Sequence, residues 1–383
     1  MNSVRLGIIG VGSMGTVHAA GILAGKIPRL TLTAVADTSP ELLTKFPDLP
    51  GFNDPDALIH SGLVDAVLIA TPHYSHTTLG IAALQAGLHV LVEKPISVHK
   101  ADCERLIAAH TDPTRIFAAM FNQRTDPYYI KLRELLTSGE LGEIRRINWI
   151  ITNWFRTEAY YSSGGWRATW GGEGGGVLLN QCPHNLDLLQ WLFGMPNKVR
   201  AFCALGKYHN IEVEDDVTAY LEYPNGATGV FITSTGEAPG TNRLEVACEN
   251  GRVVIENDRF QWIRNEVPMS EFCRTTPERF ATPPTSEITV PMDGHGGQHV
   301  EILQNFTDAI LDGTPLIAPA GEGIFSVELA NAMLLSSFTS ETISLPLDSK
   351  VYEDALKKKV AESKFDKPIS TNIATDDFSK SFA

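Results

Sequence analysis

The hydrophobic residues follow two different patterns along the chain. In about the first 120 residues, short apolar runs alternate with segments of helical periodicity. Strands buried on both faces are nearly continuous in hydrophobicity, and strands that alternate with helices form right-handed βαβ units. We therefore expect an α/β fold here, with a doubly wound parallel sheet. Strands are expected near 4–9, 31–36, 64–70, 88–92 and 115–120, and helices near 14–25, 40–46, 55–61, 75–86 and 98–110.

Strand patterns dominate after residue 124, following one helix expected from Pro127 to Thr137. Asn225-Gly226 and Asn250-Gly251 supply the positive φ that hairpin turns need. We therefore expect an α+β domain with a large, mostly antiparallel, open sheet, covered by helices on one face. Its strands are expected near 144–154, 198–206, 215–223, 226–235, 242–248, 251–256 and 259–264, and its helices near 183–193, 298–312 and 321–338.

The domain division follows from this change of pattern. A first domain is expected over 1–124, a second over 125–350, and a C-terminal extension over 351–383, which is polar after 364 and expected to be loosely ordered there.

Composition and charge exclude several classes of function. A net charge of −14 argues against a nucleic-acid or anionic membrane surface, since both need clustered Lys and Arg. No apolar run reaches the roughly 18 residues of a membrane-spanning helix, and no signal peptide is recognisable. The five cysteines are scattered without a Cys-x-x-Cys pair, which favours reduced thiols and a cytoplasmic protein.

A glycine-rich turn follows the first expected strand and reads Gly10-Val11-Gly12-Ser13-Met14-Gly15. In this G-x-G-x-x-G pattern the first glycine allows a tight turn, the second a close approach of phosphate, and the third close helix packing. Ser13 and Met14 then lie at a helix start, whose free N–H groups bind phosphates. A glycine turn without ligand is the alternative, but the flanking strand and helix favour a dinucleotide site.

Asp37 ends the second expected strand, 22 residues after Gly15. A carboxylate at this spacing accepts from a ribose 2′-OH and repels a 2′-phosphate. No arginine follows it, so the sequence favours NAD over NADP. The alternative is that Asp37 caps the helix expected at Pro40.

Polar groups also follow the third and fourth strands, at the edge where open α/β sheets bind their ligands. Thr71, Pro72, His73 and His76 are expected beside the dinucleotide, although Ser75 could simply cap the next helix. Glu93 and Lys94 follow the fourth strand, and a lysine at this edge indicates chemistry. The alternative for Lys94 is a solvated surface lysine.

These pieces together resemble the Gfo/Idh/MocA oxidoreductases, the group of glucose–fructose oxidoreductase and inositol dehydrogenase, over roughly residues 4–345. The resemblance implies an N-terminal Rossmann domain that binds NAD and a C-terminal domain that binds substrate. The large sheet of that domain would join subunits into a homodimer or homotetramer. Glu93 and Lys94 would lie beside the nicotinamide ribose, with a Lys94–Pro95 bond that is often cis. The matching stretches are 10–15, Ala70-Thr71-Pro72 with His76, Glu93-Lys94-Pro95, Trp166-Arg167, and Gly174 to Asn180 with His184 and Asp187.

The resemblance also implies further site residues. Asn122, Trp166 and Arg167 would line the cofactor. The catalytic motif of the family is Asp-x-x-x-His, which reads Asn180 to His184 in this chain. An asparagine takes no proton, so His184 becomes the expected base, Asn180 an orienting group and Lys94 the stabiliser of the alkoxide.

Asp187 follows His184 at i+3 on the same helix face and is expected to hold the imidazole tautomer. The alternative for His184 is a core histidine of an apolar helix.

Substrate contacts are expected from the second domain. Arg156 with Tyr160 and Tyr161 suits a sugar, since aromatic planes stack on C–H faces and guanidinium groups donate to hydroxyls. The alternative is that these aromatic residues belong to the core or to a subunit contact.

Two further polar stretches are expected near the crevice. Asn122-Gln123-Arg124 adds polar groups at the domain junction. In the segment from Asp293 to His299, glycines indicate a loop that brings His295 or His299 near substrate, or else a helix cap. No third ligand is evident, so we expect no metal site.

The sequence therefore predicts an NAD-dependent dehydrogenase that acts on a ring hydroxyl of a sugar, glycoside or cyclitol. One alternative is a glycosidase with retained NAD that works by oxidation, elimination and reduction. Another is a non-catalytic NAD(P)-binding sensor, which would not need both Lys94 and His184.

Overall fold

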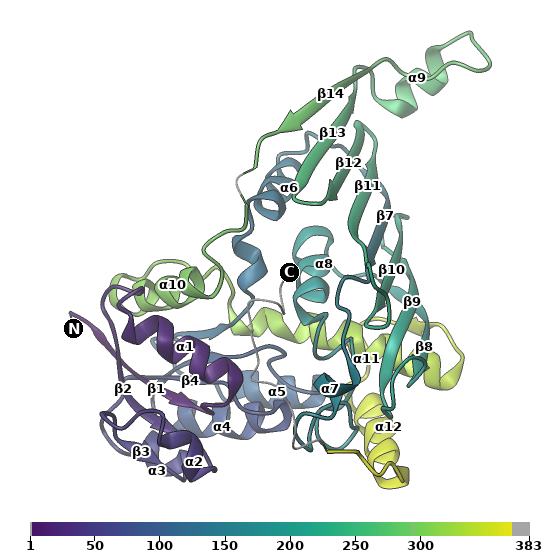
Figure 1. Ribbon diagram of the computed structural model, residues 1–383. Coiled ribbons are helices and arrows are strands. Elements are labelled where there is room, and N and C mark those ends of the chain that lie inside the picture. Colours follow the sequence, from purple (N-terminus) through teal and green to yellow (C-terminus); the bar gives the residue numbers. More distant parts are fainter. Residues whose placement is uncertain (1, 293, 370–383) are drawn as a thin grey trace.

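Two sheets organise the chain in a computed structural model that describes residues 2–292 and 294–369 (Figure 1). The first sheet is parallel, with strand order β3-β2-β1-β4-β5-β6, as expected for a doubly wound fold. The order reverses between β1 and β4, and ligands bind beside such a switch point. The strands are β1 (Val4–Ile9), β2 (Leu30–Ala36), β3 (Gly51–Phe52), β4 (Ala66–Ile69), β5 (His89–Val92) and β6 (Phe117–Ala119), and the helices are α1 (Ser13–Leu23), α2 (Pro40–Leu43), α3 (Pro55–Ile59), α4 (His73–Gln85) and α5 (Lys100–Ala108).

The second sheet has the order β14-β13-β12-β11-β7-β10-β9-β8-β15. All neighbours are antiparallel except β7 and β10, which run parallel. Both expected Asn-Gly hairpin turns are confirmed, between β9 and β10 and between β11 and β12. The strands are β7 (Ile144–Ile151), β8 (Lys198–Leu205), β9 (Glu214–Glu222), β10 (Thr228–Ser234), β11 (Asn242–Cys248), β12 (Gly251–Glu256), β13 (Arg259–Asn265), β14 (Thr285–Val290) and β15 (Ile343–Ser344).

Helices cover one face of this second sheet. In β7, Ile147, Trp149 and Ile151 are buried in alternation with more exposed residues. These buried side chains belong to one hydrophobic core with residues of α6 (Pro127–Thr137), α8 (Pro183–Phe193) and α11 (Gly323–Thr339). The period of two along β7 therefore fixes which face the helices cover.

The helix α10 (Gln298–Asp312) does not cover the second sheet, contrary to the expectation. Its buried residues Ile302, Leu303 and Phe306 belong to the core of the first domain. Arg29 of the first domain also pairs with Asp308 and Asp312 of this helix. Figure 1 shows α10 beside α1. An apolar stripe predicts that a helix is buried, but it does not say against which sheet.

A packed helix, which the sequence analysis did not predict, leads into the C-terminal extension. In α12 (Ser349–Glu362), Tyr352 and Leu356 are buried in the core of the second domain. Beyond it, Lys367 donates to the main-chain oxygen of Arg167. The expected loose order concerns residues beyond 364, of which 370–383 lie outside the described residues.

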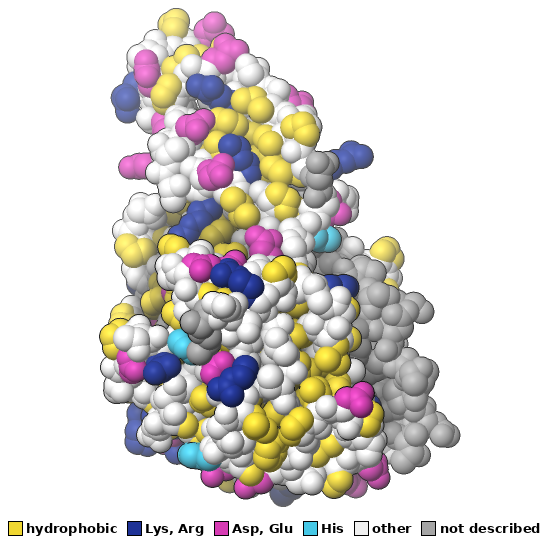
Figure 2. Space-filling view, turned by 90° about the vertical axis from the view of Figure 1, so that its left-hand side faces the viewer, with side chains coloured by type: hydrophobic (Ala, Val, Ile, Leu, Met, Phe, Trp, Pro, Cys, Tyr) yellow, Lys and Arg dark blue, Asp and Glu magenta, His cyan; other side chains and the backbone are white. Residues whose placement is uncertain are grey.

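Among residues 2–292 and 294–369, no helix is long and apolar enough to cross a membrane. The five cysteines are free thiols. On the face of the molecule where α1 and α10 lie, acidic and basic side chains are intermixed (Figure 2).

The remaining short elements are α7 (Glu158–Tyr161), α9 (Met269–Thr275) and the 3₁₀ turns η1 (Asn122–Thr125) and η2 (Ala320–Glu322).

Candidate active site

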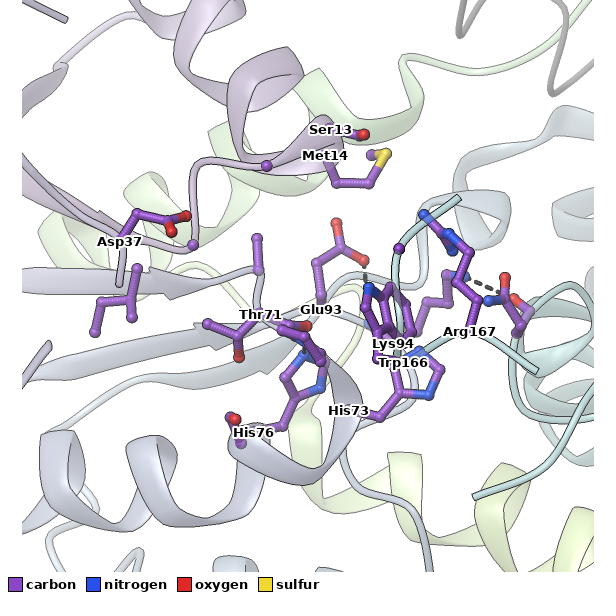
Figure 3. A pocket seen from close by; sticks show the side chains of 18 of the residues that line it. Ser13, Met14, Asp37, Thr71, His73, His76, Glu93, Lys94, Trp166 and Arg167 are labelled. Carbon is purple, nitrogen blue, oxygen red and sulfur yellow. Dashed lines mark hydrogen bonds between the residues drawn. The ribbon is translucent and has the colours of Figure 1, made fainter. Parts of the chain in front are cut away.

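One cavity of about 780 Å³ runs from the glycine turn after β1 to the start of α8 in the second domain. Figure 3 shows the side chains that converge on it from both domains. Most of the residues expected at the site line this cavity. They are Gly10, Gly12, Ser13, Met14, Asp37, Thr71, Pro72, His73, His76, Glu93, Lys94, Arg156, Tyr160, Trp166, Arg167, Asn180, His184 and His299.

The glycine turn forms the end of the cavity nearest β1. Gly10 has a φ of +90°, and a Cβ on Gly15 would come within 1.9 Å of the Gly10 oxygen, so neither position admits a side chain. A Cβ on Gly12 would meet nothing within 4 Å, because Gly12 borders the cavity. Helix α1 has no side-chain cap. Its first N–H groups suit a pyrophosphate, so the turn fits a dinucleotide.

Asp37 joins the end of β2 to the glycine turn. Its carboxylate accepts from the main-chain N–H of Val11 and of Ser39, both at 2.9 Å. Ser39, not Asp37, is the N-cap residue of α2. The carboxylate lines the cavity where the expected ribose hydroxyl group would lie.

Glu93 at the end of β5 is held by a histidine that the sequence analysis missed. His18 Nε2 donates to Glu93 Oε1 at 2.7 Å, and the Lys94 N–H donates to Glu93 Oε2 at 3.1 Å. Burial favours the neutral acid, but the hydrogen bond and charge of His18, together with the charges of His299 and Lys94, outweigh it and hold the pKa of Glu93 at about 2. The signal was present, because His18 interrupts the buried stripe of α1 between Gly15 and Ile22.

Lys94 points across the cavity toward the second domain. Its Nζ donates to the main-chain oxygen of Asn180 at 2.8 Å. Burial lowers the pKa of the Lys94 ammonium, while the carboxylates of Glu93 and Glu173 oppose that shift. The Lys94–Pro95 peptide bond is cis, as the resemblance implied.

His184 is buried at the second position of α8, directly after Pro183. Burial, together with the charges of Lys94 and His299, holds the pKa of His184 well below 6.5. The imidazole is therefore neutral near pH 7 and is able to accept a proton.

The expected bond between Asp187 and His184 is absent. Asp187 instead receives two hydrogen bonds from Arg124, at 2.6 and 2.7 Å. Among the described residues, Nδ1 of His184 has no hydrogen-bond partner. A bidentate bond to a guanidinium group is stronger than a bond to a neutral imidazole, which explains the choice of Asp187.

The Asn180 side chain lies between the cavity and a buried carboxylate. Its Nδ2 donates to Glu173 Oε1, while its Oδ1 accepts from Tyr160 Oη and from Gln181 Nε2, both at 3.2 Å. Glu173 is buried behind the cavity wall. The sequence analysis missed Glu173, because its place beside a glycine run carries no periodic signal.

Comparison with known proteins agrees with this geometry. Residues 4–121 match the NAD-binding Rossmann fold of an oxidoreductase family, and residues 129–254 match the GFO/IDH/MocA C-terminal domain. The oxidoreductase YdgJ of Escherichia coli is 32% identical over 265 residues, which cover 69% of this chain and 71% of YdgJ. This chain belongs to the Gfo/Idh/MocA family of oxidoreductases.

Other relatives of this Gfo/Idh/MocA oxidoreductase carry more specific names. The myo-inositol 2-dehydrogenase of Thermotoga maritima is 29% identical over 67% of this chain and 76% of its own length. The WlbA dehydrogenase of Chromobacterium violaceum, solved with NADH and UDP-GlcNAcA, is 26% identical. Its structure has a TM-score of 0.78, covering 91% of this chain and 97% of WlbA.

Two guanidinium groups lie close to one aromatic ring on the second-domain side of the cavity. The Arg156 guanidinium lies 5.2 Å from the centre of the Tyr160 ring and that of Arg167 lies 4.9 Å from it. Tyr161 does not line the cavity. It is buried, with its hydroxyl group 2.8 Å from Thr235 Oγ1.

Three of the expected site residues lie elsewhere. Gly15 packs beneath the turn, as its predicted role requires. Asn122 is buried at the domain junction, where it donates to Gln298 of α10, and it does not line the cavity. His295 lies 3.3 Å from the Tyr128 hydroxyl group, outside the cavity, and its neighbour Asp293 is outside the described residues. Asn122 therefore does not line this cavity, and its contact with the cofactor stays a prediction.

His73 and His76, which follow β4, contact main-chain oxygens of neighbouring loops. His76 Nδ1 lies 2.8 Å from the main-chain oxygen of Pro95, and its Nε2 lies 2.8 Å from that of Thr71. His73 Nδ1 lies 3.4 Å from the main-chain oxygen of Glu173. Helix α4 begins at His73, so Ser75 is not its cap.

Proposed function

We propose that the chain is an NAD-dependent dehydrogenase that oxidises, or reversibly reduces, a ring hydroxyl of a sugar, glycoside or cyclitol. The observation that carries the proposal is the continuous cavity. It joins the glycine turn and Asp37 at one end to Lys94, Asn180 and His184 at the other. Relatives named myo-inositol 2-dehydrogenase and levoglucosan dehydrogenase support the substrate class.

The proposed cofactor site uses the first domain. Gly12, Ser13 and Met14 would hold the pyrophosphate, and Asp37 would accept from a ribose 2′-OH. Bound NAD supplies the hydride acceptor. Residues between these ends would line the rest of the cofactor: Thr71, Pro72, His73, His76, Glu93, Trp166 and Arg167.

His184 and Lys94 divide the proton and charge work in the proposed reaction. The neutral His184 ring takes the proton of the substrate hydroxyl group. The Lys94 ammonium stabilises the negative charge that develops on that oxygen. Asn180 orients the hydroxyl group through its side-chain oxygen.

Arg156 and Tyr160 complete the proposed substrate site. Tyr160 supplies an aromatic face and a hydroxyl group that donates to Asn180, so it links the sugar face to the reacting end. Arg156 brings a cation to the same side of the cavity.

The test is turnover of the purified chain with NAD and a panel of sugars, glycosides and inositols. We expect NADH to form with at least one class of substrate. Lys94→Ala should lower kcat by roughly a hundredfold or more, because it removes a charge aimed at the alkoxide. NADH binding, followed by fluorescence titration, should persist in that variant.

Two results would contradict the proposal. Undiminished turnover by Lys94→Ala would remove lysine from the chemistry. Release of cleaved sugar without net NADH would instead identify the glycosidase with retained NAD. Lys94→Arg is the matched control, because it keeps the charge while changing its position.

A further inference from the structure

We propose that Glu173 is a positioning residue that supplies the negative charge behind the reacting end of the cavity, and that it acts through one hydrogen bond to Asn180. The inference rests on the proposed function and assigns a role to a residue that would touch neither substrate nor cofactor. The pair of Glu173 and Asn180 needs one carboxylate and one amide, and either position can carry either group.

Glu173 is a buried carboxylate with defined partners. Only 1% of the surface of Glu173 is exposed. Oε2 accepts from the Ala168 N–H at 2.6 Å, and Oε1 accepts from Asn180 Nδ2. Burial raises the pKa of the Glu173 carboxyl group above its ordinary value, while the charge of Arg167, the two donors and the charge of Lys367 oppose that shift and favour the ionised form.

The bond to Glu173 sets the orientation of the Asn180 amide. An ionised carboxylate only accepts hydrogen bonds, so the NH₂ group of Asn180 must face it. The Oδ1 atom then faces the other way, toward Tyr160 Oη and Gln181 Nε2, which both donate to it. Asn180 thereby presents an acceptor, not a donor, on the side of the cavity where a substrate hydroxyl group would lie.

The same carboxylate acts on Lys94. The Lys94 ammonium bonds the main-chain oxygen of Asn180. The carboxylates of Glu93 and Glu173 act on it favourably, whereas the guanidinium groups of Arg156 and Arg167 oppose its charge. Glu93 already accepts from His18, so Glu173 provides a second balancing charge. The other charged groups that face Glu173 are Arg167, Lys367 and Glu214.

The pair therefore has two acceptable states and two unacceptable ones. A carboxylate at 173 with an amide at 180, or the reverse, makes a donor–acceptor bond and keeps one negative charge. Two carboxylates repel, and two amides lose the charge that faces Lys94. The doubly substituted E173Q/N180D protein should consequently recover what each single substitution loses.

The experiment compares wild type, E173Q, N180D and the double variant. We expect each single variant to lower kcat by roughly tenfold or more, with the KM for NAD little changed, and the double variant to return within about threefold of wild type. The thermal midpoint of the protein without cofactor should fall in both single variants and recover in the double variant. E214Q is the matched control for kcat, because Glu214 is as buried but bonds main-chain N–H groups, among them those of Gly176 and Leu178, and not Asn180.

Specific outcomes overturn the inference. Losses in kcat that multiply in the double variant would show that the two positions act independently. Recovery of the thermal midpoint without recovery of kcat would reduce the pair to a structural contact. A wild-type protein that oxidises nothing in the panel would contradict the proposed function, whereas the thermal midpoints would still test the pairing.

A second measurement covers the case in which E173Q does not fold. In N180D two carboxyl groups face each other, and they share one proton at low pH. Its kcat should therefore rise relative to wild type as the pH falls below neutrality. A constant ratio between the two proteins across that range would contradict the proposal.

Discussion

Individual side chains at this site are defined by partners that lie far away in sequence. Asp187 stands at i+3 from His184, which suggested a pair, yet it bonds Arg124 of η1 instead. Helical spacing predicts which residues share a face, but it does not predict a competing guanidinium group from another element. Lys94 was singled out because it follows a strand end, and His184 because it matches the motif of the family that the sequence resembles. His18 was missed because its partner Glu93 lies 75 residues away, and Glu173 because it stands in a glycine run without a periodic pattern.

The lowered pKa of His184 predicts the pH at which kcat/KM falls on the acid side. Burial and the charges of Lys94 and His299 keep the ring neutral below its ordinary value of 6.5, so the base form persists into mildly acidic solution. We expect kcat/KM to fall only when the pH drops well below 6.5, as the ring becomes protonated. A pH profile of kcat/KM with saturating NAD checks this. An ascending limb centred at or above 6.5 would assign the base to another group.

Helices and strands were predicted well where periodicity or turn residues mark them. The expected helices at 183–193 and 298–312 match α8 and α10, and the expected strands match all of the central strands to within about two or three residues at each end. The edge strand β14 and the helix α9 were missed. Both are largely exposed, so they lack the apolar alternation that identifies buried elements.

The turn that starts α1 predicts two separable defects. Gly15→Ala would place a Cβ against the Gly10 main-chain oxygen, so we expect a lower thermal midpoint even without cofactor. Gly12→Ala meets no protein atom within 4 Å and should leave that midpoint unchanged. It should nevertheless weaken NAD binding by roughly tenfold or more, because the methyl group would occupy the phosphate approach. Calorimetric titration with NAD, and thermal melting without it, would reveal whether the two effects separate.

Strand β9 carries a carboxylate that should make stability depend on pH. Burial raises the pKa of Glu214 to about 7 from an ordinary 4.5. Between these values the folded chain holds a proton that the unfolded chain has lost, so this contribution to stability falls as the pH rises. Glu214→Gln does not titrate, and its stability relative to wild type should rise over that window by up to about 3 kcal/mol. Urea unfolding at pH 5 and pH 8 provides the comparison, and an unchanged difference would contradict it.

Across the entire chain, sequence predicted both sheets but not how the segments return to them. The parallel and the mostly antiparallel character of the sheets followed from alternation and hairpins, whereas α10 packs on the first domain although it follows most of the second in sequence. The cavity depends on that return, because His299 at the start of α10 reaches the first-domain residue His18, with ring centres 5.4 Å apart. Such contacts depend on three-dimensional topology, which no local pattern encodes.

The uncovered face of the second sheet predicts assembly with a second copy of the chain. Phe202 of β8 is 64% exposed and Tyr220 of β9 is 44% exposed on this sheet. We expect a homodimer or homotetramer, and Phe202→Glu should shift it toward monomers because a buried charge opposes association. Sedimentation velocity would measure the shift. Phe280→Glu, at a fully exposed position outside the sheet, is the control and should leave the assembly intact.

The packing of α10 also bears on whether the nucleotide-binding half could exist alone. Helix α10 contributes Ile302, Leu303 and Phe306 to the core of a domain whose last strand ends at Ala119. A fragment that stopped at residue 124 would expose the apolar surface that these side chains cover, although it would contain every strand of the first sheet. The two halves of this oxidoreductase are therefore unsuited to exchange as separate modules, because a gene fusion at the apparent boundary would leave one core open to aggregation.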